Sequence, residues 1–152
     1  MGLVSDTHGL ADERLLQALA GCELLLHAGD IGPGVLERLR SVAPVVAVRG
    51  NTDRSAEFSA LPFVQRLELA GHPVALVHRR EDAPADGWRL LVCGHTHRPC
   101  VEERDGRWVV NPGAAGRRGF HDRRTAALLE LEPGRPPLVR LIDLGPRRGG
   151  EP

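Results

Sequence analysis

Residues 24–33 read Leu-Leu-Leu-His-Ala-Gly-Asp-Ile-Gly-Pro, in which a short apolar run stops abruptly at glycine and aspartate. The same pattern occurs on either side. Residues 2–9 read Gly-Leu-Val-Ser-Asp-Thr-His-Gly, and residues 44–53 read Pro-Val-Val-Ala-Val-Arg-Gly-Asn-Thr-Asp. Continuous apolar runs that end at turn residues are typical of strands covered on both faces, as in parallel sheets.

Two helices are predicted between these three strands. Asp12 and Glu13 suit the first turn of one helix and Pro33 that of the other, while Gly21 suits a helix end. Apolar residues at helical spacing follow each start: Leu15, Leu16 and Leu19, then Val35, Leu36, Leu39 and Val42. The first third of the chain therefore predicts a β-α-β-α-β unit with parallel strands.

The rest of the chain changes to short strands separated by tight turns. Asp105-Gly106 is a strong hairpin signal, and Gly71-His-Pro73 and Pro133-Gly134 also mark turns. The predicted strands cover residues 64–69, 73–78, 90–93, 99–104, 107–111, 125–132 and 138–144. We expect an α/β (α+β) fold in one domain, residues 1–144, with two packed sheets flanked by helices and a frayed tail at residues 145–152.

The composition excludes several classes of protein. The chain has 152 residues, of which 41% are hydrophobic and 26% charged, which is ordinary for one globular domain. No apolar run approaches the ~20 residues that span a bilayer, and the first residues lack the basic and apolar regions of a signal peptide. Three cysteines without zinc spacing suit reduced thiols, so we expect a cytoplasmic protein.

Seven side chains that can bind metal lie directly after predicted strands. The carboxyl edge of an open α/β sheet is where ligands bind, and glycines at 9, 29, 50 and 94 would allow tight turns there. The seven residues are Asp6, His8, Asp30, Asn51, His78, His95 and His97. Each short motif is weak alone, because such dipeptides also occur in ordinary turns. Five such motifs in order, each at a strand end, are improbable by coincidence.

The donor set indicates a dinuclear centre. Two Asp, one Asn and four His combine hard and borderline donors, which favours Mn²⁺, with Fe²⁺, Zn²⁺ and Ni²⁺ as alternatives. Seven ligands exceed the needs of one tetrahedral ion and suit two ions joined by a carboxylate. Two ions about 3.5–4 Å apart clamp a phosphoryl group and lower the pKa of a bridging water toward ~7. The sequence therefore predicts phosphoester hydrolysis by a metal-bridging hydroxide.

The ordered motifs resemble those of the calcineurin-like metallophosphoesterases, over residues 2–132. The segments that carry the resemblance are Asp6-x-His8, Gly29-Asp30, Gly50-Asn51-x-Asp53, His78, Gly94-His-x-His97 and Asn111-Pro-Gly113. The short length is similar to the compact bacterial and archaeal phosphodiesterase branch, which includes the retromer's phosphoesterase-like subunit. The resemblance implies a four-layer αββα sandwich of two mixed sheets, with the site at one sheet edge.

The resemblance also implies how the ligands divide between two metal ions. Each ion has four ligands, and Asp30 is shared by both. One ion is held by Asp6, His8, Asp30 and His97, and the other by Asp30, Asn51, His78 and His95. Asp30, Asn51 and His95 are then the catalytic residues that frame the reacting phosphate.

Two positions depart from the family. Larger relatives have His where this chain has Thr52, and that His protonates the leaving group, which a threonine hydroxyl cannot do at neutral pH. His78 is followed by Arg79 and Arg80 where Gly is common. These arginines are either phosphate contacts or solvated loop residues, and we predict that one of them binds substrate phosphate.

Other polar residues are assigned lesser roles. His27 and Asp53 are expected to support their neighbours rather than bind metal, and His72 is expected in a solvated turn. His121 is expected in an ordinary loop, although it is the first candidate to supply the general acid that Thr52 cannot provide. In the loop 114–124, a solvated face is the default and substrate steering the alternative for four arginines: Arg117, Arg118, Arg123 and Arg124.

The sequence thus predicts a metal-dependent phosphoesterase, with phosphodiesters favoured over monoesters. Its partner would be a small-molecule phosphoester at a shallow, open site. One rival is a protein-interaction scaffold on the same fold, which would need none of the seven ligands. A nucleic-acid-binding module is disfavoured by equal numbers of basic and acidic residues, 20 of each, and by 3% aromatic residues. No membrane partner is expected, and the oligomeric state is left open.

Overall fold

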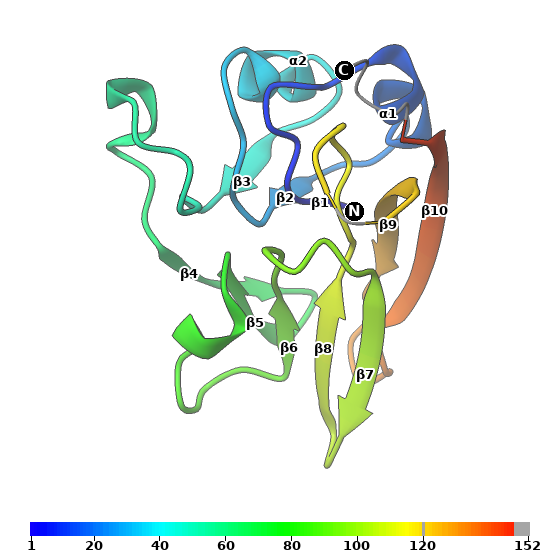
Figure 1. The fold of residues 1–152 in the computed structure, drawn as a ribbon. Coiled ribbons are helices and arrows are strands. Elements are labelled where there is room, and N and C mark those ends of the chain that lie inside the picture. The colour runs from blue at the N-terminus through cyan, green and yellow to red at the C-terminus, as the bar shows by residue number, and fades with distance from the viewer. Residues whose placement is uncertain (120, 148–152) are drawn as a thin grey trace.

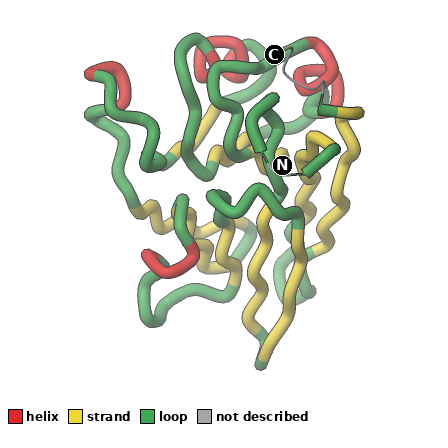
Figure 2. The backbone as a smooth tube through the Cα atoms, in the orientation of Figure 1, coloured by secondary structure: helices red, strands yellow, loops and turns green. Residues whose placement is uncertain are grey.

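Two stacked β-sheets form the centre of the computed structural model, which describes residues 1–119 and 121–147 (Figures 1 and 2). The first sheet has the strand order β10-β9-β1-β2-β3, and the second has β4-β5-β6-β8-β7. The strand bounds are β1 Gly2–Val4, β2 Leu25–His27, β3 Val45–Ala47, β4 Val64–Leu69, β5 His72–Val77, β6 Leu90–Val92, β7 Cys100–Arg104, β8 Arg107–Asn111, β9 Arg123–Glu130 and β10 Leu138–Pro146.

Both sheets are mixed, as predicted. The strands β1, β2 and β3 pair in parallel, and β9 joins β1 in the antiparallel sense. In the second sheet β5, β6 and β8 are parallel, whereas β4 and β7 are antiparallel strands at the two edges. The parallel strands of each sheet carry the predicted ligands just beyond their carboxyl ends.

Continuous apolar strands occur because each sheet is covered on both faces. Leu3 and Leu26 point into the core between the sheets, where they pack with residues of the second sheet such as Leu76. Their neighbours Val4 and Leu25 point to the opposite face and pack under the helices. Successive residues of a strand point to opposite faces, so a strand buried on both sides needs apolar residues at every position.

The outer layers differ in thickness. Helices α1 (Glu13–Ala18) and α2 (Val35–Arg40) cover the outer face of the first sheet, with the 3-10 turn η1 (Ala56–Phe58) beside them (Figure 2). The outer face of the second sheet is covered by a loop that contains only the 3-10 turn η2 (Arg80–Asp82). The αββα order is confirmed, with a thin fourth layer. None of the described helices is both long and apolar enough to cross a bilayer.

The turns fix the strand ends. Arg104 pairs with Arg107 around a two-residue hairpin loop in which Asp105 and Gly106 both have positive φ, as the sequence predicts. At the other end of the chain β10 continues to Pro146, so the frayed tail predicted from residue 145 starts too early. A register shift between Asp143 and Pro146 interrupts the alternation of inward and outward residues, so the sequence pattern does not indicate the last residues of the strand. Residues 148–152 of the predicted tail lie outside the described residues.

Candidate metal centre

The seven predicted ligands come together where the two sheets meet at one end of the sandwich. The first sheet supplies residues that follow β1, β2 and β3, and the second supplies residues that follow β5 and β6. The carboxylate of Asp30 lies between the sheets: its Oδ2 is 3.3 Å from Nε2 of His78 and 3.9 Å from Nε2 of His8. Asp30 therefore lies between the two groups of predicted ligands, where a carboxylate shared by two ions would lie.

One half of the centre is formed by Asp6, His8 and His97. Their ligand atoms all lie within 4.8 Å of one another, and Oδ1 of Asp6 is 3.1 Å from Nε2 of His97. Oδ1 of Asp6 and Nε2 of His8 are buried and have no hydrogen-bond partner among the described residues. Buried polar atoms are nearly always satisfied, so two such atoms in one cluster fit a cation bound between them.

The other half is centred on His78. Its Nδ1 lies 2.7 Å from the carbonyl of Ala28, which can only accept, so Nδ1 carries a proton. This leaves Nε2 to point at Asp30 and at Oδ1 of Asn51, 2.9 Å away. A backbone carbonyl bound to one ring nitrogen is the usual support of a metal-ligating histidine. The exposed His95 lies edge-on to His78, with ring centroids 5.1 Å apart.

The backbone of the ligand loops is strained. Residues with a side chain rarely adopt positive φ, which costs of order 1–3 kcal/mol for a strained residue. Five of the seven predicted ligands adopt it: Asp6 (φ 52°), His8 (φ 44°), Asp30 (φ 54°), His95 (φ 69°) and His97 (φ 61°). Strain of this kind gathers at functional sites, because the surrounding structure holds residues in place for a purpose other than stability.

Two glycines let the loops approach the carboxylates. A Cβ added to Gly50 would lie 2.1 Å from Oδ1 of Asp30, and one on Gly94 would lie 1.9 Å from Oγ of Ser5. Of the four glycines expected to allow tight turns, Gly9 (φ 87°) and Gly29 (φ 92°) have positive φ, whereas Gly50 and Gly94 do not. Gly50 and Gly94 are needed because any side chain would displace the residues that hold Asp6 and Asp30.

Asp53 and His27 support the ligand loops, as predicted. Oδ1 of Asp53 accepts the N–H of Ile31 at 2.8 Å and Oδ2 accepts that of Gly50 at 2.9 Å, so it joins the loops after β2 and β3. Nδ1 of His27 accepts the N–H of Gly29, and Nε2 lies 2.9 Å from Oγ1 of Thr7. Burial lowers the pKa of His27 to about 3 and keeps the ring neutral.

The sequence did not predict two residues that orient the metal-binding side chains and their loops. Oγ of Ser5 donates to Oδ2 of Asp6 at 2.6 Å, which turns Oδ1 toward His97. Nδ2 of Asn111 donates to the carbonyl of Gly94 at 2.9 Å and to Oγ1 of Thr96 at 3.1 Å, which fixes the loop of His95 and His97. The Asn-Pro-Gly motif marked Asn111 without giving it a role, and nothing in the sequence distinguishes Ser5.

The charges of the centre are coupled. Burial alone would raise the pKa of Asp30, but the hydrogen bond from His78, the N–H of Thr52 at 2.9 Å and the charge of His78 together hold it well below the usual range. Burial is the largest single effect on the pKa of His78 and would lower it, but the hydrogen bond to Asp30, the charges of Asp30 and Asp6 and the bond to Ala28 together raise it. Burial lowers the pKa of His8, and the charge of Arg118 acts in the same direction. An ionised Asp30 is thus ready to bind a cation.

The remaining candidates are dispersed. Arg79 is half-buried at the start of η2, next to His78, while the guanidinium of Arg80 pairs with Glu102 at 2.8 Å. Thr52 is exposed beside Asp30. His121 is half-buried, and its Nε2 has no hydrogen-bond partner among the described residues.

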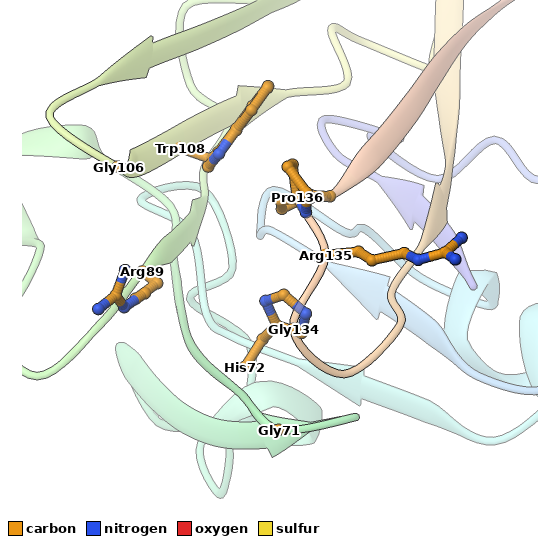
Figure 3. Close-up of a pocket in the computed structure, with 9 residues that line it drawn as sticks. Gly71, His72, Arg89, Gly106, Trp108, Gly134, Arg135 and Pro136 are labelled. Atoms are coloured by element: carbon orange, nitrogen blue, oxygen red, sulfur yellow. The ribbon is translucent and has the colours of Figure 1, made fainter.

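A cavity of about 370 Å³ lies at the other end of the strands, where β5 begins (Figure 3). His72 lines this cavity as the first residue of β5, not in the turn predicted for it, and its half-buried ring bonds through Nε2 to the carbonyl of Glu132 at 2.8 Å. The side chains of Arg89 and Arg135 point away from His72 (Figure 3). The polar groups of this cavity therefore do not converge, whereas those of the metal centre do.

Comparisons with known proteins agree with this geometry. The family model for the calcineurin-like phosphoesterase superfamily domain matches residues 1–134. A probable metallophosphoesterase of Methanothermobacter thermautotrophicus is 32% identical over 131 residues, which cover 75% of this chain and 76% of that protein. Phosphodiesterase YfcE of Escherichia coli is 35% identical over 139 residues, which cover 72% and 76%. The Vps29 of Entamoeba histolytica complexed with Zn²⁺ shares the fold, with a TM-score of 0.75 at 19% identity over 95% of this chain and all of that one. The chain belongs to the calcineurin-like phosphoesterase superfamily.

Proposed function

We propose that this protein hydrolyses small-molecule phosphodiesters at a centre of two divalent metal ions, with Mn²⁺ as the preferred ion. The observation that carries the proposal is the convergence of acidic and imidazole ligands from both sheets on Asp30, beside two buried atoms without a hydrogen-bond partner among the described residues. A mixture of carboxylate, amide and imidazole donors suits such ions.

The residues divide into two sets that share Asp30. Asp6, His8 and His97 would hold one ion with it, and Asn51, His78 and His95 would hold the other. Two bound ions supply Lewis acidity at the phosphoryl oxygens and lower the pKa of water to give the nucleophile. Asn51 and His95 lie on the accessible side and frame the phosphate. Ser5, Asp53 and Asn111 keep the ligand loops in place during the reaction.

Diesters are favoured for two reasons. The ligand His95 and the neighbouring Thr52 are exposed, so the rim leaves room for a substituent on each side of the phosphate. The relative YfcE is named a phosphodiesterase. The scaffold alternative gains nothing from the structure, because a scaffold has no use for strained ligand residues. The three cysteines are free thiols, which suits the cytoplasmic location that we propose.

Arg79 is the better candidate for a phosphate contact, because Arg80 is already paired with Glu102. Arg79→Ala should raise KM while metal content stays the same, and Arg80→Ala serves as the control with unchanged KM. Equal kinetics for both variants and the wild type would leave these arginines as loop residues.

The test of the proposed function combines metal analysis with hydrolysis. We expect two Mn²⁺ ions per chain at saturation, and Mn²⁺-dependent release of p-nitrophenol from bis(p-nitrophenyl) phosphate faster than from p-nitrophenyl phosphate. At most one ion per chain would overturn the dinuclear centre. Absence of hydrolysis by the fully loaded protein would overturn the enzymatic function.

A further inference from the structure

The main chain of residues 115–119 runs past one half of the metal centre. The N–H of Ala115 donates to the carbonyl of Ser5 at 3.0 Å, and that of Gly116 donates to the carbonyl of Asp6 at 3.1 Å. A Cβ added to Gly119 would lie 2.6 Å from Nδ1 of His97. The segment therefore follows the loop after β1 and then reaches His97. The main chain of the two residues in between, Arg117 and Arg118, therefore passes the rim formed by His8 and His97.

The structure separates the arginines that the sequence grouped together. Arg123 forms an exposed pair with Asp143. Arg124 is buried and bound to Asp12 through both terminal nitrogens. Arg117 lines a separate cavity of about 320 Å³ together with Arg14, Asp12 and Arg124. These three arginines therefore have places away from the reacting centre.

Arg118 has a different environment. Its side chain is exposed and makes no hydrogen bond or ion pair within residues 1–119 and 121–147. Arg118 lies between Gly116, which bonds the carbonyl of Asp6, and Gly119, which lies beside His97. Its carbonyl accepts a hydrogen bond from the guanidinium of Arg147, so the main chain at Arg118 is anchored although the side chain is not. A cation is thus held at the rim of the metal centre and left available to an anion.

We propose that Arg118 binds a second negatively charged group of the substrate, one substituent away from the phosphate under attack. The inference rests on the proposed function, since the metal ions would already neutralise the phosphate itself. A guanidinium offers two parallel N–H groups to a carboxylate or phosphate. The preferred substrates are therefore phosphoesters that carry an additional carboxylate or phosphate on the His8–His97 side.

The first experiment measures binding without turnover. Two phosphonates of equal length, 4-phosphonobutyrate and butylphosphonate, differ only in the carboxylate and are titrated calorimetrically into the Mn²⁺-loaded protein. We expect the carboxylate to strengthen binding about 5-fold at low salt, as for an exposed ion pair at the upper end of its range. Arg118→Gln should remove this preference and Arg118→Glu should reverse it. Arg117→Gln, the matched neighbour, should retain it.

The second experiment measures selectivity in turnover. The substrates are p-nitrophenyl 3-carboxypropyl phosphate and the same diester with its carboxylate converted to a methyl ester. The two share a leaving group and differ in one charge. The wild type should favour the charged substrate through KM, and Arg118→Gln should equalise the two. If neither is hydrolysed but the phosphonate preference depends on Arg118, the enzymatic function fails and the anion site stands. If both are hydrolysed and Arg118→Gln leaves the selectivity as in the wild type, the anion site is overturned.

Discussion

Asp30 contacts both halves of the metal centre through one oxygen and the N–H of Thr52 through the other. Asp30→Asn keeps an acceptor for that N–H but removes the charge. We therefore expect a folded protein that binds at most one ion, with activity reduced at least about 100-fold, more than for loss of a supporting residue. Metal analysis and kinetics at saturating Mn²⁺ test this. Two ions retained by the variant would contradict the shared carboxylate.

Asp53 provides the matched comparison, because it is buried close by yet binds only backbone N–H groups. An amide in place of this carboxylate would put its own NH2 group against one of the backbone N–H groups that the carboxylate accepts. Asp53→Asn should therefore lose about 1–3 kcal/mol of unfolding free energy but still bind two ions at saturating Mn²⁺. The two substitutions separate binding of metal from support of the loops.

Thr52 lies at the exposed rim, at the position where the family resemblance predicts an acid. Without an acid the departing oxygen leaves as an anion, so kcat/KM should fall steeply as the pKa of the leaving group rises. General acid catalysis contributes about 10²–10⁴-fold, and Thr52→His should restore part of this for alkyl esters. A series of aryl and alkyl phosphodiesters measures the slope. A flat dependence, with chemistry rate-limiting, would require another acid, and His121 is the first residue to substitute.

Helix α1 is tied to β9 by a partly buried ion pair. Asp12 caps α1 and also accepts two hydrogen bonds from Arg124, whose side chain is only 7% exposed. Asp12→Asn preserves the cap, because Asn is equally good there, but leaves the guanidinium without its counter-ion. We expect a loss of about 1.5–3 kcal/mol in urea unfolding at pH 7. Asp143→Asn, which breaks the exposed pair with Arg123, should have a much smaller effect.

The same pair predicts a pH dependence. The hydrogen bond from Arg124 is the main cause that lowers the pKa of Asp12 in the folded protein. Because the pKa of Asp12 is lower in the folded protein than its ordinary value of ~4, the ionised carboxylate stabilises the fold at pH values above ~4. This stabilisation is lost as the pH falls through the folded-state pKa. The difference between wild type and Asp12→Asn should therefore be constant from pH 7 to about pH 5 and shrink below about pH 4. A difference that grows on acidification would contradict the pairing.

At the scale of the whole molecule, the metal centre joins the two sheets. Asp6 and Asp30 extend from the first sheet, while His78 and His97 extend from the second, so bound ions would link both layers. An ion present at 100 times its Kd adds about 2.7 kcal/mol, which corresponds to a rise in Tm of about 5–10 °C for a domain of this size. Calorimetry with Mn²⁺ and with chelator measures the shift, and Asp30→Asn should show less of it. Equal Tm values in both conditions would show that no ion binds the folded state.

The sequence by itself determined the strands, the parallel pairing of the first three and the ligand loops. Continuous apolar runs signalled the buried strands, and an acidic, amide or imidazole residue followed each strand that carries a predicted ligand. These signals are local, because burial on both faces and a tight stop leave their pattern within a few residues. The seven ligand positions could therefore be named before any three-dimensional arrangement was known.

Only the tertiary structure decided which residues serve the ligands and which arginines face the centre. Ser5 and Asn111 are effective because β1, β6 and β8 end at the same edge, although Asn111 lies 17 residues from the Gly94 carbonyl that it binds. Arg118 and Arg124 look alike in the sequence, yet one is exposed at the rim and the other is buried against α1. The left-handed backbone of five predicted ligands, Asp6 among them, opposes local preference, so only packing by the rest of the fold imposes it. Contacts between distant segments depend on sheet order, which local pattern does not encode.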